Sequence, residues 1–192
     1  KQKQETWFDI STLKEPFRVE GKKTLGYEIA EQLGWRLPDV IVYETGGGTG
    51  LIGMWKAFNE LKLLGTVSGK LPRMVAAQST GCAPVVKAFQ QRENKTEFWE
   101  NSETVALGLN VPGPIGGYWI LRILYESNGI AVDVPESDLQ NLTDEFNSIT
   151  RINAGPEAGV VWGAFQKLRN VGWIDNSQSV VLFATGIERC KL

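Results

Sequence analysis

The sequence predicts an α/β protein with a mainly parallel sheet flanked by helices, forming a single unit over residues 1–192. Short apolar or β-branched runs, typical of strands buried on both faces, alternate with longer segments whose apolar residues recur at helical spacing. Each apolar run is also followed by a turn-forming sequence. This alternation favours parallel strands that are joined by helices.

Four strands and seven helices are expected along the chain. The expected strands cover residues 40–43, 73–78, 130–134 and 179–184. The expected helices cover residues 21–33, 50–64, 83–91, 102–109, 116–127, 137–149 and 156–171. Gly34 and Gly65 follow the first two of these helices, where a glycine commonly ends a helix. The proline- and glycine-rich loop at residues 110–117 is interpreted either as part of a pocket wall or as a plain connection.

Composition excludes several classes of function. The chain has no histidine, which rules out Ser-His-Asp and Cys-His catalysis and metal sites with histidine ligands. Its 20 basic and 22 acidic residues are interspersed, so no basic face for nucleic acid is expected. No apolar run approaches the length of a membrane span, and the first residues do not resemble a signal peptide. A cytoplasmic protein that binds neither nucleic acid nor membrane is therefore predicted.

The two cysteines give no sign of a disulfide framework or a metal site. Cys82 and Cys190 lie far apart in the sequence and neither belongs to a Cys-x-x-Cys pair. Both thiols are expected to be reduced, as is usual in the cytosol.

A glycine cluster between an expected strand and an expected helix predicts an anion-binding site. Gly46, Gly47 and Gly48 follow the strand at residues 40–43, and a helix is expected from Gly50 onward. Backbone N–H groups at a helix N-terminus attract anions, and glycine lets the backbone approach them closely. Thr49 adds a hydroxyl donor, so a phosphate group is the expected ligand. A tight turn without a ligand is the alternative.

The residues around this cluster separate several phosphate ligands. Gly50 is followed by Leu51 rather than by Lys-Ser/Thr, which disfavours a nucleoside triphosphatase. Residues 48–53 do satisfy the G-x-G-x-x-G pattern of dinucleotide-binding folds. However, the next expected strand ends in Gln78 and carries no carboxylate for a ribose, so NAD binding is the least favoured interpretation.

Three segments resemble threonine synthase, a fold-type-II enzyme dependent on pyridoxal phosphate. They are EGKKTLGYE at residues 20–28, TGGGTGLIGMWKAF at residues 45–58 and GCAP at residues 81–84. The resemblance extends over residues 7–185 and implies the large cofactor-binding domain of that fold, present here as roughly the C-terminal half of the enzyme.

The resemblance also implies roles for particular residues. It assigns the cofactor phosphate to Gly46, Gly47, Gly48 and Thr49, with Thr45 as their neighbour. Thr185, in the segment VVLFATG at residues 180–186, inherits the contact to the pyridine nitrogen. A hydroxyl in this position would leave the ring largely neutral. Glu157, in the segment PEAG, either faces the pocket or simply supplies favourable charge at a helix N-terminus.

The reaction implied by the resemblance converts O-phosphohomoserine and water to threonine and phosphate. Such enzymes hold the cofactor through a Schiff-base lysine in a Ser-Phe-Lys motif. None of the eight phenylalanines is followed by lysine, so no catalytic residue is assigned and the chain alone is expected to be inactive. It is expected to act with a complementing N-terminal segment, as part of a longer polypeptide or in a homodimer.

Two further interpretations and two departures from the family pattern remain. The chain is alternatively a non-catalytic module that binds a phosphate ligand or pairs with a full-length subunit, or, least favoured, an NAD-binding domain. Glu44 stands where the family usually has proline, and a carboxylate near a phosphate is unfavourable unless it points away. The ending at residues 185–192 also differs from the family's.

Overall fold

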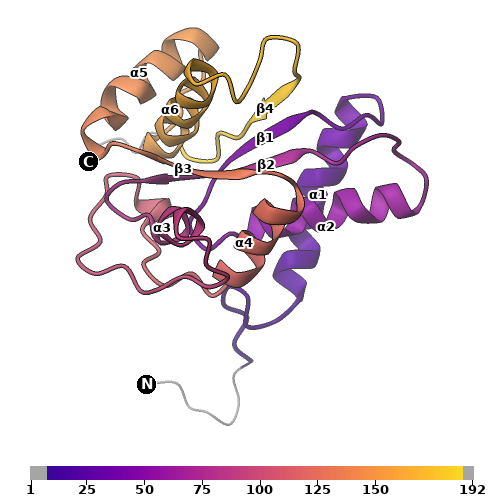
Figure 1. Ribbon diagram of the computed structural model, residues 1–192, viewed down its shortest axis with the longest axis horizontal. Helices are drawn as coiled ribbons and strands as arrows, with labels where there is room; N and C mark the ends of the chain where they lie inside the picture. Colours follow the sequence, from indigo (N-terminus) through magenta and orange to yellow (C-terminus); the bar gives the residue numbers. More distant parts are fainter. Residues whose placement is uncertain (1–7, 188–192) are drawn as a thin grey trace.

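A four-stranded parallel sheet forms the centre of the molecule, which a computed structural model describes over residues 8–187 (Figure 1). Its order is β3-β2-β1-β4. The strands are β1 (Val40–Glu44), β2 (Arg73–Ser79), β3 (Ile130–Val134) and β4 (Val180–Leu182). The predicted fold class and the positions of all four strands are confirmed. One detail differs, because β4 is an edge strand and is only half-buried rather than covered on both faces.

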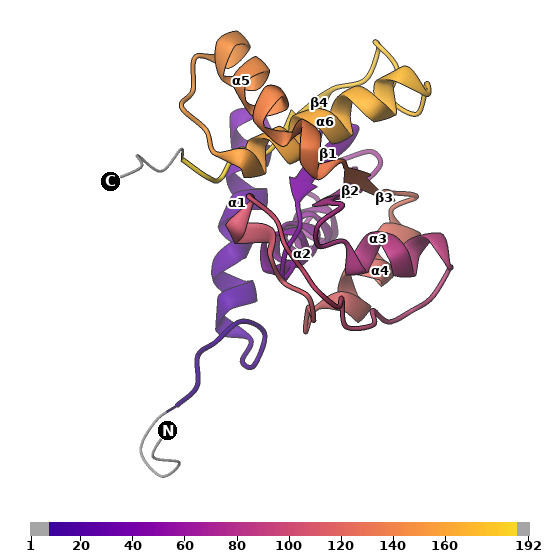
Figure 2. The same cartoon turned by 90° about the vertical axis from the view of Figure 1, so that its left-hand side faces the viewer.

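Helices cover both faces of the sheet, as Figure 2 shows. On one side lie α1 (Phe17–Gln32), α2 (Thr49–Leu63), α3 (Pro84–Gln90) and α4 (Gly117–Glu126), and on the other α5 (Leu139–Thr150) and α6 (Pro156–Asn170). Short 3-10 turns occur at η1 (Leu107–Leu109) and η2 (Glu136–Asp138). The side chains of β1 alternate between the two layers of helices. Ile41 packs toward α2 and α4, while its neighbours Val40 and Val42 pack toward α6.

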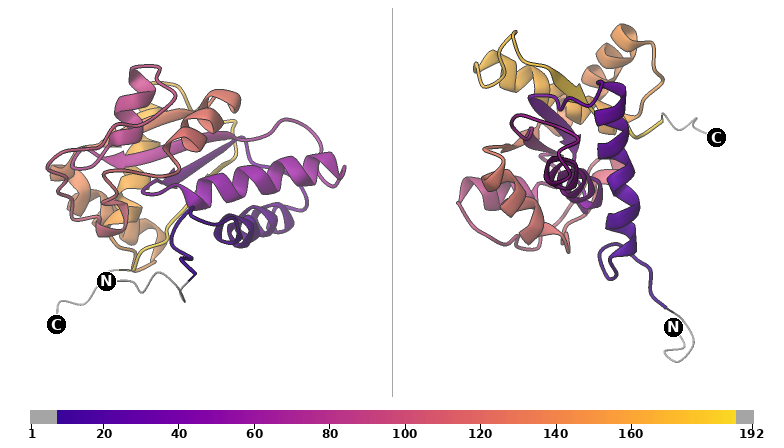
Figure 3. Two further views of the ribbon diagram at one scale, coloured as in Figure 1. Left: turned by 90° about the horizontal axis from the view of Figure 1, so that it is seen from below. Right: turned by 90° about the vertical axis from the view of Figure 1, so that its right-hand side faces the viewer.

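Helices α1 and α2 lie side by side (Figure 3) and approach unusually closely. A Cβ atom added to Gly26 would come within 2.7 Å of the Ala57 methyl group, and one added to Gly53 would come within 2.6 Å of Lys22. Glycine at both positions therefore permits this spacing. Lys23 crosses the contact and forms an ion pair with Glu60 at 2.9 Å.

The helix predicted over residues 102–109 is wrong except for the single turn η1. Tertiary partners use the backbone groups that a helix would have needed. The Glu103 N–H donates to the Gly81 carbonyl at 3.1 Å, and the Val105 N–H donates to Oε1 of Glu136 at 2.6 Å. The first helix also begins earlier than expected, at Phe17, with Oε1 of Glu15 accepting the Arg18 N–H at 3.2 Å.

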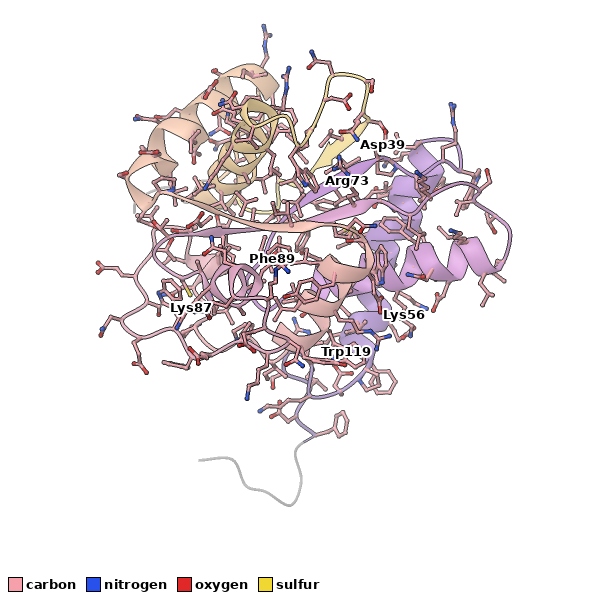
Figure 4. All side chains as sticks on the ribbon, in the orientation of Figure 1. Asp39, Lys56, Arg73, Lys87, Phe89 and Trp119 are labelled. Atoms are coloured by element: carbon pink, nitrogen blue, oxygen red, sulfur yellow. The ribbon has the colours of Figure 1, made fainter. Side chains whose placement is uncertain are left out.

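Side chains at the amino ends of β1 and β2 hold the edge strand in place. Arg73, labelled in Figure 4, stacks on Trp173 with its guanidinium carbon 3.8 Å from the ring centre. It also donates to the Trp173 carbonyl at 3.1 Å and to Oε1 of Gln178 at 2.9 Å. Asp39 accepts the Ser179 N–H at 2.8 Å. These contacts fix the segment that leads into β4.

Within residues 8–187, no helix combines the length and the apolar character that crossing a membrane requires.

Candidate functional site

The order of the strands creates a crevice at the carboxyl ends of β1 and β4. From β1 the chain moves outward to β2 and then β3, and it returns on the other side of β1 as β4. The connections that leave β1 and β4 therefore diverge. In open parallel sheets, such a switch point is the usual place for a ligand.

The glycine loop occupies this crevice between the end of β1 and the start of α2. Gly48 precedes the helix with a φ of 79°, a backbone conformation that glycine adopts without strain. No side chain caps the N-terminus of α2, so its first N–H groups are free of a side-chain acceptor within the described residues. The helix has 15 residues and its positive end points at the loop. An uncapped helix N-terminus behind a glycine loop is the arrangement that the predicted anion site requires.

Gly47 is the loop glycine with the most open surroundings. A Cβ atom placed on it would have Thr12 Cγ2 at 3.4 Å as its nearest neighbour, which is an ordinary contact. A Cβ atom on Gly46 would instead lie 2.9 Å from the Gly108 carbonyl oxygen, and one on Gly48 would overlap the Ile120 side chain. A side chain at Gly47 would therefore have room, whereas the Cβ positions of Gly46 and Gly48 are blocked by neighbouring protein atoms.

A cavity of about 490 Å³ opens over the loop. Its walls come from the loop, from α1, from the turn after β4 and from the segment near η1. Predicted residues on its lining are Gly46, Gly47, Gly48, Thr49, Glu157 and Thr185. Further lining residues include Thr12, Arg18, Lys22, Glu44, Gly108 and Val111. The structure thus brings together six of the seven predicted site residues.

Thr45, the seventh, is fully buried and is not part of this lining. Its hydroxyl donates to the Tyr43 carbonyl at 2.9 Å, and its own carbonyl accepts a hydrogen bond from Nε2 of Gln78 at 2.9 Å. Oε1 of Gln78 accepts the N–H groups of Val85 and Val86 at the start of α3. Thr45 supports the loop from beneath, and Gln78 connects that support to α3.

Glu44 and the segment after β4 meet at the cavity wall. Oε1 of Glu44 accepts the Thr185 N–H at 3.1 Å, whereas Oε2 has no hydrogen-bond partner within the described residues. Only 3% of Glu44 is exposed. Burial raises the pKa of the Glu44 carboxyl to about 7, although hydrogen bonds from Thr185 lower it in part. Burial, and to a lesser degree the charge of Glu44, raises the pKa of Tyr43 to about 12.

Glu157 lies in the first turn of α6 and also faces the cavity. Its Oε1 accepts the Gly108 N–H at 2.9 Å, and its Oε2 would lie only 2.6 Å from a Cβ atom added to Gly186. The position therefore combines the two interpretations of the sequence, since the carboxylate is at a helix N-terminus and on the cavity wall. It holds the η1 segment against the turn after β4.

Sequence reasoning did not single out Thr12, Lys22 or Gly108 as site residues. Thr12 and Gly108 belong to no pattern that would reveal them, whereas Lys22 lies in the segment at residues 20–28 that resembles the family, without a role being assigned to it. The 110–117 loop does contribute to the wall through Val111, Gly113 and Ile115. Of its two interpretations, the structure therefore supports the pocket wall.

In the part of the chain that the structure describes, neither a reactive cysteine nor a metal centre is found near the cavity. Cys82 is buried with a free thiol, whose pKa burial raises, while Cys190 lies outside the described residues together with the rest of the 188–192 ending. Among residues 8–187, no group of three or more cysteine or acidic side chains is placed to hold a metal ion.

Comparison with known proteins identifies the family of the chain. A family model described as pyridoxal-phosphate dependent enzyme matches residues 1–186. The threonine synthase of Methanosarcina acetivorans is 32% identical over 171 residues, which cover 89% of this chain and 42% of that protein. The threonine synthase of Methanocaldococcus jannaschii is 30% identical over 171 residues, with the same coverage. The predicted resemblance is confirmed, and the chain spans less than half the length of these relatives.

Among solved structures, a fungal L-serine ammonia-lyase from Rhizomucor miehei superposes on the chain with a TM-score of 0.72. The two are 18% identical, and the match covers 88% of this chain and 52% of the fungal one. At this identity the likeness supports the fold alone, and it agrees with the predicted fold-type-II architecture.

Proposed function

Because the chain belongs to the pyridoxal-phosphate dependent enzyme family, we propose that it is part of a threonine synthase, which converts O-phosphohomoserine and water to threonine and phosphate. The similarity to two curated threonine synthases supports the reaction. The observation that carries the proposal is the open glycine loop at the N-terminus of α2, on the wall of a 490 Å³ cavity. We also propose that the protein is cytoplasmic, as the sequence leads us to expect.

The residues on the cavity wall fit the cofactor. The loop N–H groups of Gly46, Gly47 and Gly48, with the Thr49 hydroxyl, would hold the cofactor phosphate, and Thr185 would contact the ring nitrogen. Thr45 would act as a structural support, because its hydroxyl is engaged by the Tyr43 carbonyl. When bound, pyridoxal phosphate withdraws electrons from the substrate and so eases loss of its phosphate.

Binding of pyridoxine 5′-phosphate tests the loop assignment directly. This compound carries the ring and phosphate of the cofactor but has no aldehyde, so its binding does not need a Schiff-base lysine. Calorimetry should show saturable binding to the chain and at least a tenfold weaker affinity for Gly47→Leu, because the new side chain fills the space above the loop.

Gly21→Leu is the matched control. Gly21 is exposed on α1, and a Cβ atom there has no neighbour within 4 Å. This variant should bind the ligand like the unmodified chain. Equal affinity of Gly47→Leu and Gly21→Leu would contradict the loop assignment.

We further propose that the chain is inactive alone and acts with a complementing N-terminal segment or within a homodimer. The proposal rests on the absence of a Ser-Phe-Lys motif from the sequence. Borohydride treatment of the chain with pyridoxal phosphate should give no single stoichiometric adduct. One such adduct at a defined lysine, for example Lys22 on the cavity wall, would overturn this proposal.

The coding sequence upstream of Lys1 tests the reaction itself. We expect it to encode a Ser-Phe-Lys motif in the same reading frame, and the longer protein should release phosphate from O-phosphohomoserine. A longer protein that binds the cofactor without releasing phosphate would instead support the non-catalytic phosphate-ligand or subunit-pairing module.

A further inference from the structure

The outer edge of β4 is apolar and partly exposed. The strand pairs with β1 on one side and lies at the end of the sheet (Figure 1). Its three residues and the following Phe183 are apolar, yet each of them is only half-buried. A continuous apolar run of this kind is typical of a parallel strand that has helices on both faces of its sheet. The composition of β4 therefore matches an interior strand, whereas its position is at the rim.

The backbone of β4 has hydrogen-bonding groups that point away from β1. The Phe183 N–H donates to the Val42 carbonyl at 3.1 Å and so points toward β1. Successive residues of a strand direct their backbone groups to opposite sides, so those of Val180 and Leu182 point outward. Among the described residues, no group outside the sheet accepts a hydrogen bond from either N–H. Both residues can therefore pair with another strand.

The opposite edge of the sheet, formed by β3, is protected against such pairing. Asp133 places a charge within β3, and its carboxylate pairs with Lys167 at 3.0 Å. Nζ of Lys167 also donates to the Asp133 carbonyl at 3.2 Å, which occupies a backbone acceptor of this strand. Natural sheets use charged residues and covered backbone groups to keep an edge from pairing. No charged residue lies in β4, so its edge lacks this protection.

A groove of about 230 Å³ lies beside β4, between this strand and α1. Leu25 and Ile29 form its α1 side, and Val181 and Phe183 line it from the β4 side. These four side chains are partly buried and pack against the hydrophobic core between the sheet and helices α2 and α4. An added strand could therefore extend this core by placing apolar side chains in the groove. Two polar residues of α1 also line it, Glu28 and Gln32.

We propose, resting on the threonine synthase function proposed above, that the outer edge of β4 pairs with a strand from the N-terminal segment of the longer polypeptide. More than half the length of the related threonine synthases lies outside the matched region, which leaves enough chain for such a strand. Pairing satisfies the outward backbone groups of Val180 and Leu182 and covers the groove. It also holds β4, and with it Thr185 on the cavity wall, more firmly against β1.

Amide hydrogen exchange tests this pairing by comparing the 192-residue chain with the longer protein that includes the upstream coding sequence. In the chain alone, the Val180 and Leu182 amides should exchange rapidly, because no acceptor protects them. In the longer protein both amides should exchange at least about a hundredfold more slowly.

The outward amides of β3 are the matched control. The Thr80 N–H donates to the Val134 carbonyl, so the alternate residues Ala131 and Asp133 point away from β2. Their amides should exchange at the same rate in both proteins.

A proline substitution tests the outward N–H itself. Val180→Pro removes this group but no hydrogen bond to β1, and proline is tolerated at the first residue of a strand. Val180→Thr keeps the N–H and the branched shape, and it is the control. In the longer protein, the Leu182 amide should exchange at least about tenfold faster in Val180→Pro than in Val180→Thr. In the 192-residue chain, the two variants should exchange alike at Leu182.

Several results would overturn the proposal. One is equal exchange of Val180 and Leu182 in the chain and the longer protein, and another is new protection of Ala131 and Asp133 in their place. Protection that appears in the 192-residue chain as its concentration rises would assign the edge to a second copy. A reading frame that begins at Lys1 would leave no N-terminal segment. If Val180→Pro does not fold, the comparison of the two unmodified proteins decides.

The outcomes also separate the strand pairing from the function on which it rests. A longer protein that releases phosphate from O-phosphohomoserine while the β4 edge stays unprotected would overturn the pairing alone. Protection of Val180 and Leu182 without phosphate release would support the pairing and contradict the proposed reaction.

Discussion

The Thr185 N–H donates a hydrogen bond to Glu44 Oε1 at 3.1 Å, joining two residues that are 141 positions apart in the sequence. This contact links the end of β1 to the segment that follows β4. Burial of the Glu44 carboxyl raises its pKa to about 7 despite this hydrogen bond, and the raised pKa has a measurable effect on stability.

Stability should fall as the pH rises from about 4.5 to about 7. In this interval Glu44 keeps its proton in the folded chain and loses it in the unfolded one, so raising the pH favours unfolding. The loss is at most about 3 kcal/mol for a pKa shift of this size. Urea unfolding at pH 5 and pH 8 should show that Glu44→Gln reduces the loss. Glu100→Gln, at an exposed position, should leave it unchanged.

Gly48→Ala should destabilise the chain by about 2–4 kcal/mol, because alanine strains a backbone with a φ of 79° and its methyl group overlaps Ile120. Gly47→Ala is the control, since its methyl group meets only Thr12 at an ordinary distance. It should change the free energy of unfolding by less than about 0.5 kcal/mol. Similar urea midpoints for the two variants would contradict this account of the loop.

Gln78→Leu should lower stability by about 2–4 kcal/mol. The substitution keeps the size of the side chain but leaves the Thr45 carbonyl and the N–H groups of Val85 and Val86 without their buried partner. Gln140→Leu, on the exposed surface of α5, should cost much less. Chemical unfolding measures both, and an equally small effect at the two positions would show that Gln78 is dispensable.

Arg73→Lys should destabilise the chain by about 1–2 kcal/mol, since lysine cannot both stack flat on Trp173 and donate to two acceptors. The Trp173 ring should at the same time become more accessible to quenchers of its fluorescence. Arg36→Lys, at an exposed position, is the control and should match the unmodified chain. Unaltered stability and quenching in Arg73→Lys would show that the stacked contact is unimportant.

Sequence patterns were sufficient for the strands and for the glycine loop at the N-terminus of α2, because both depend on local order. An apolar run such as residues 40–43 has few ways to be buried, and a run of glycines before a helix exposes N–H groups wherever it occurs. The helix expected at residues 102–109 failed because Gly81 and Glu136, both distant in the sequence, take its hydrogen bonds.

The remaining details of the site depend on contacts that no local pattern contains. Thr45 and Thr49 flank the same glycines, yet the first turns its hydroxyl to Tyr43 and the second lines the cavity. The sequence identifies Glu44 as a departure from the family but does not reveal that its partner is Thr185. The contact between Glu44 and Thr185 forms only because β4 returns beside β1.

The close approach of α1 and α2 has a consequence for the order in which the molecule opens. Their contact at Gly26 and Ala57 joins segments that are near each other in the sequence, with β1 between them. Such a unit closes a short loop and gains packing early. In hydrogen exchange, the amide protons of α1 and α2 should therefore be replaced together and late. The half-buried strand β4 should exchange first, releasing Thr185 while the cradle is still intact.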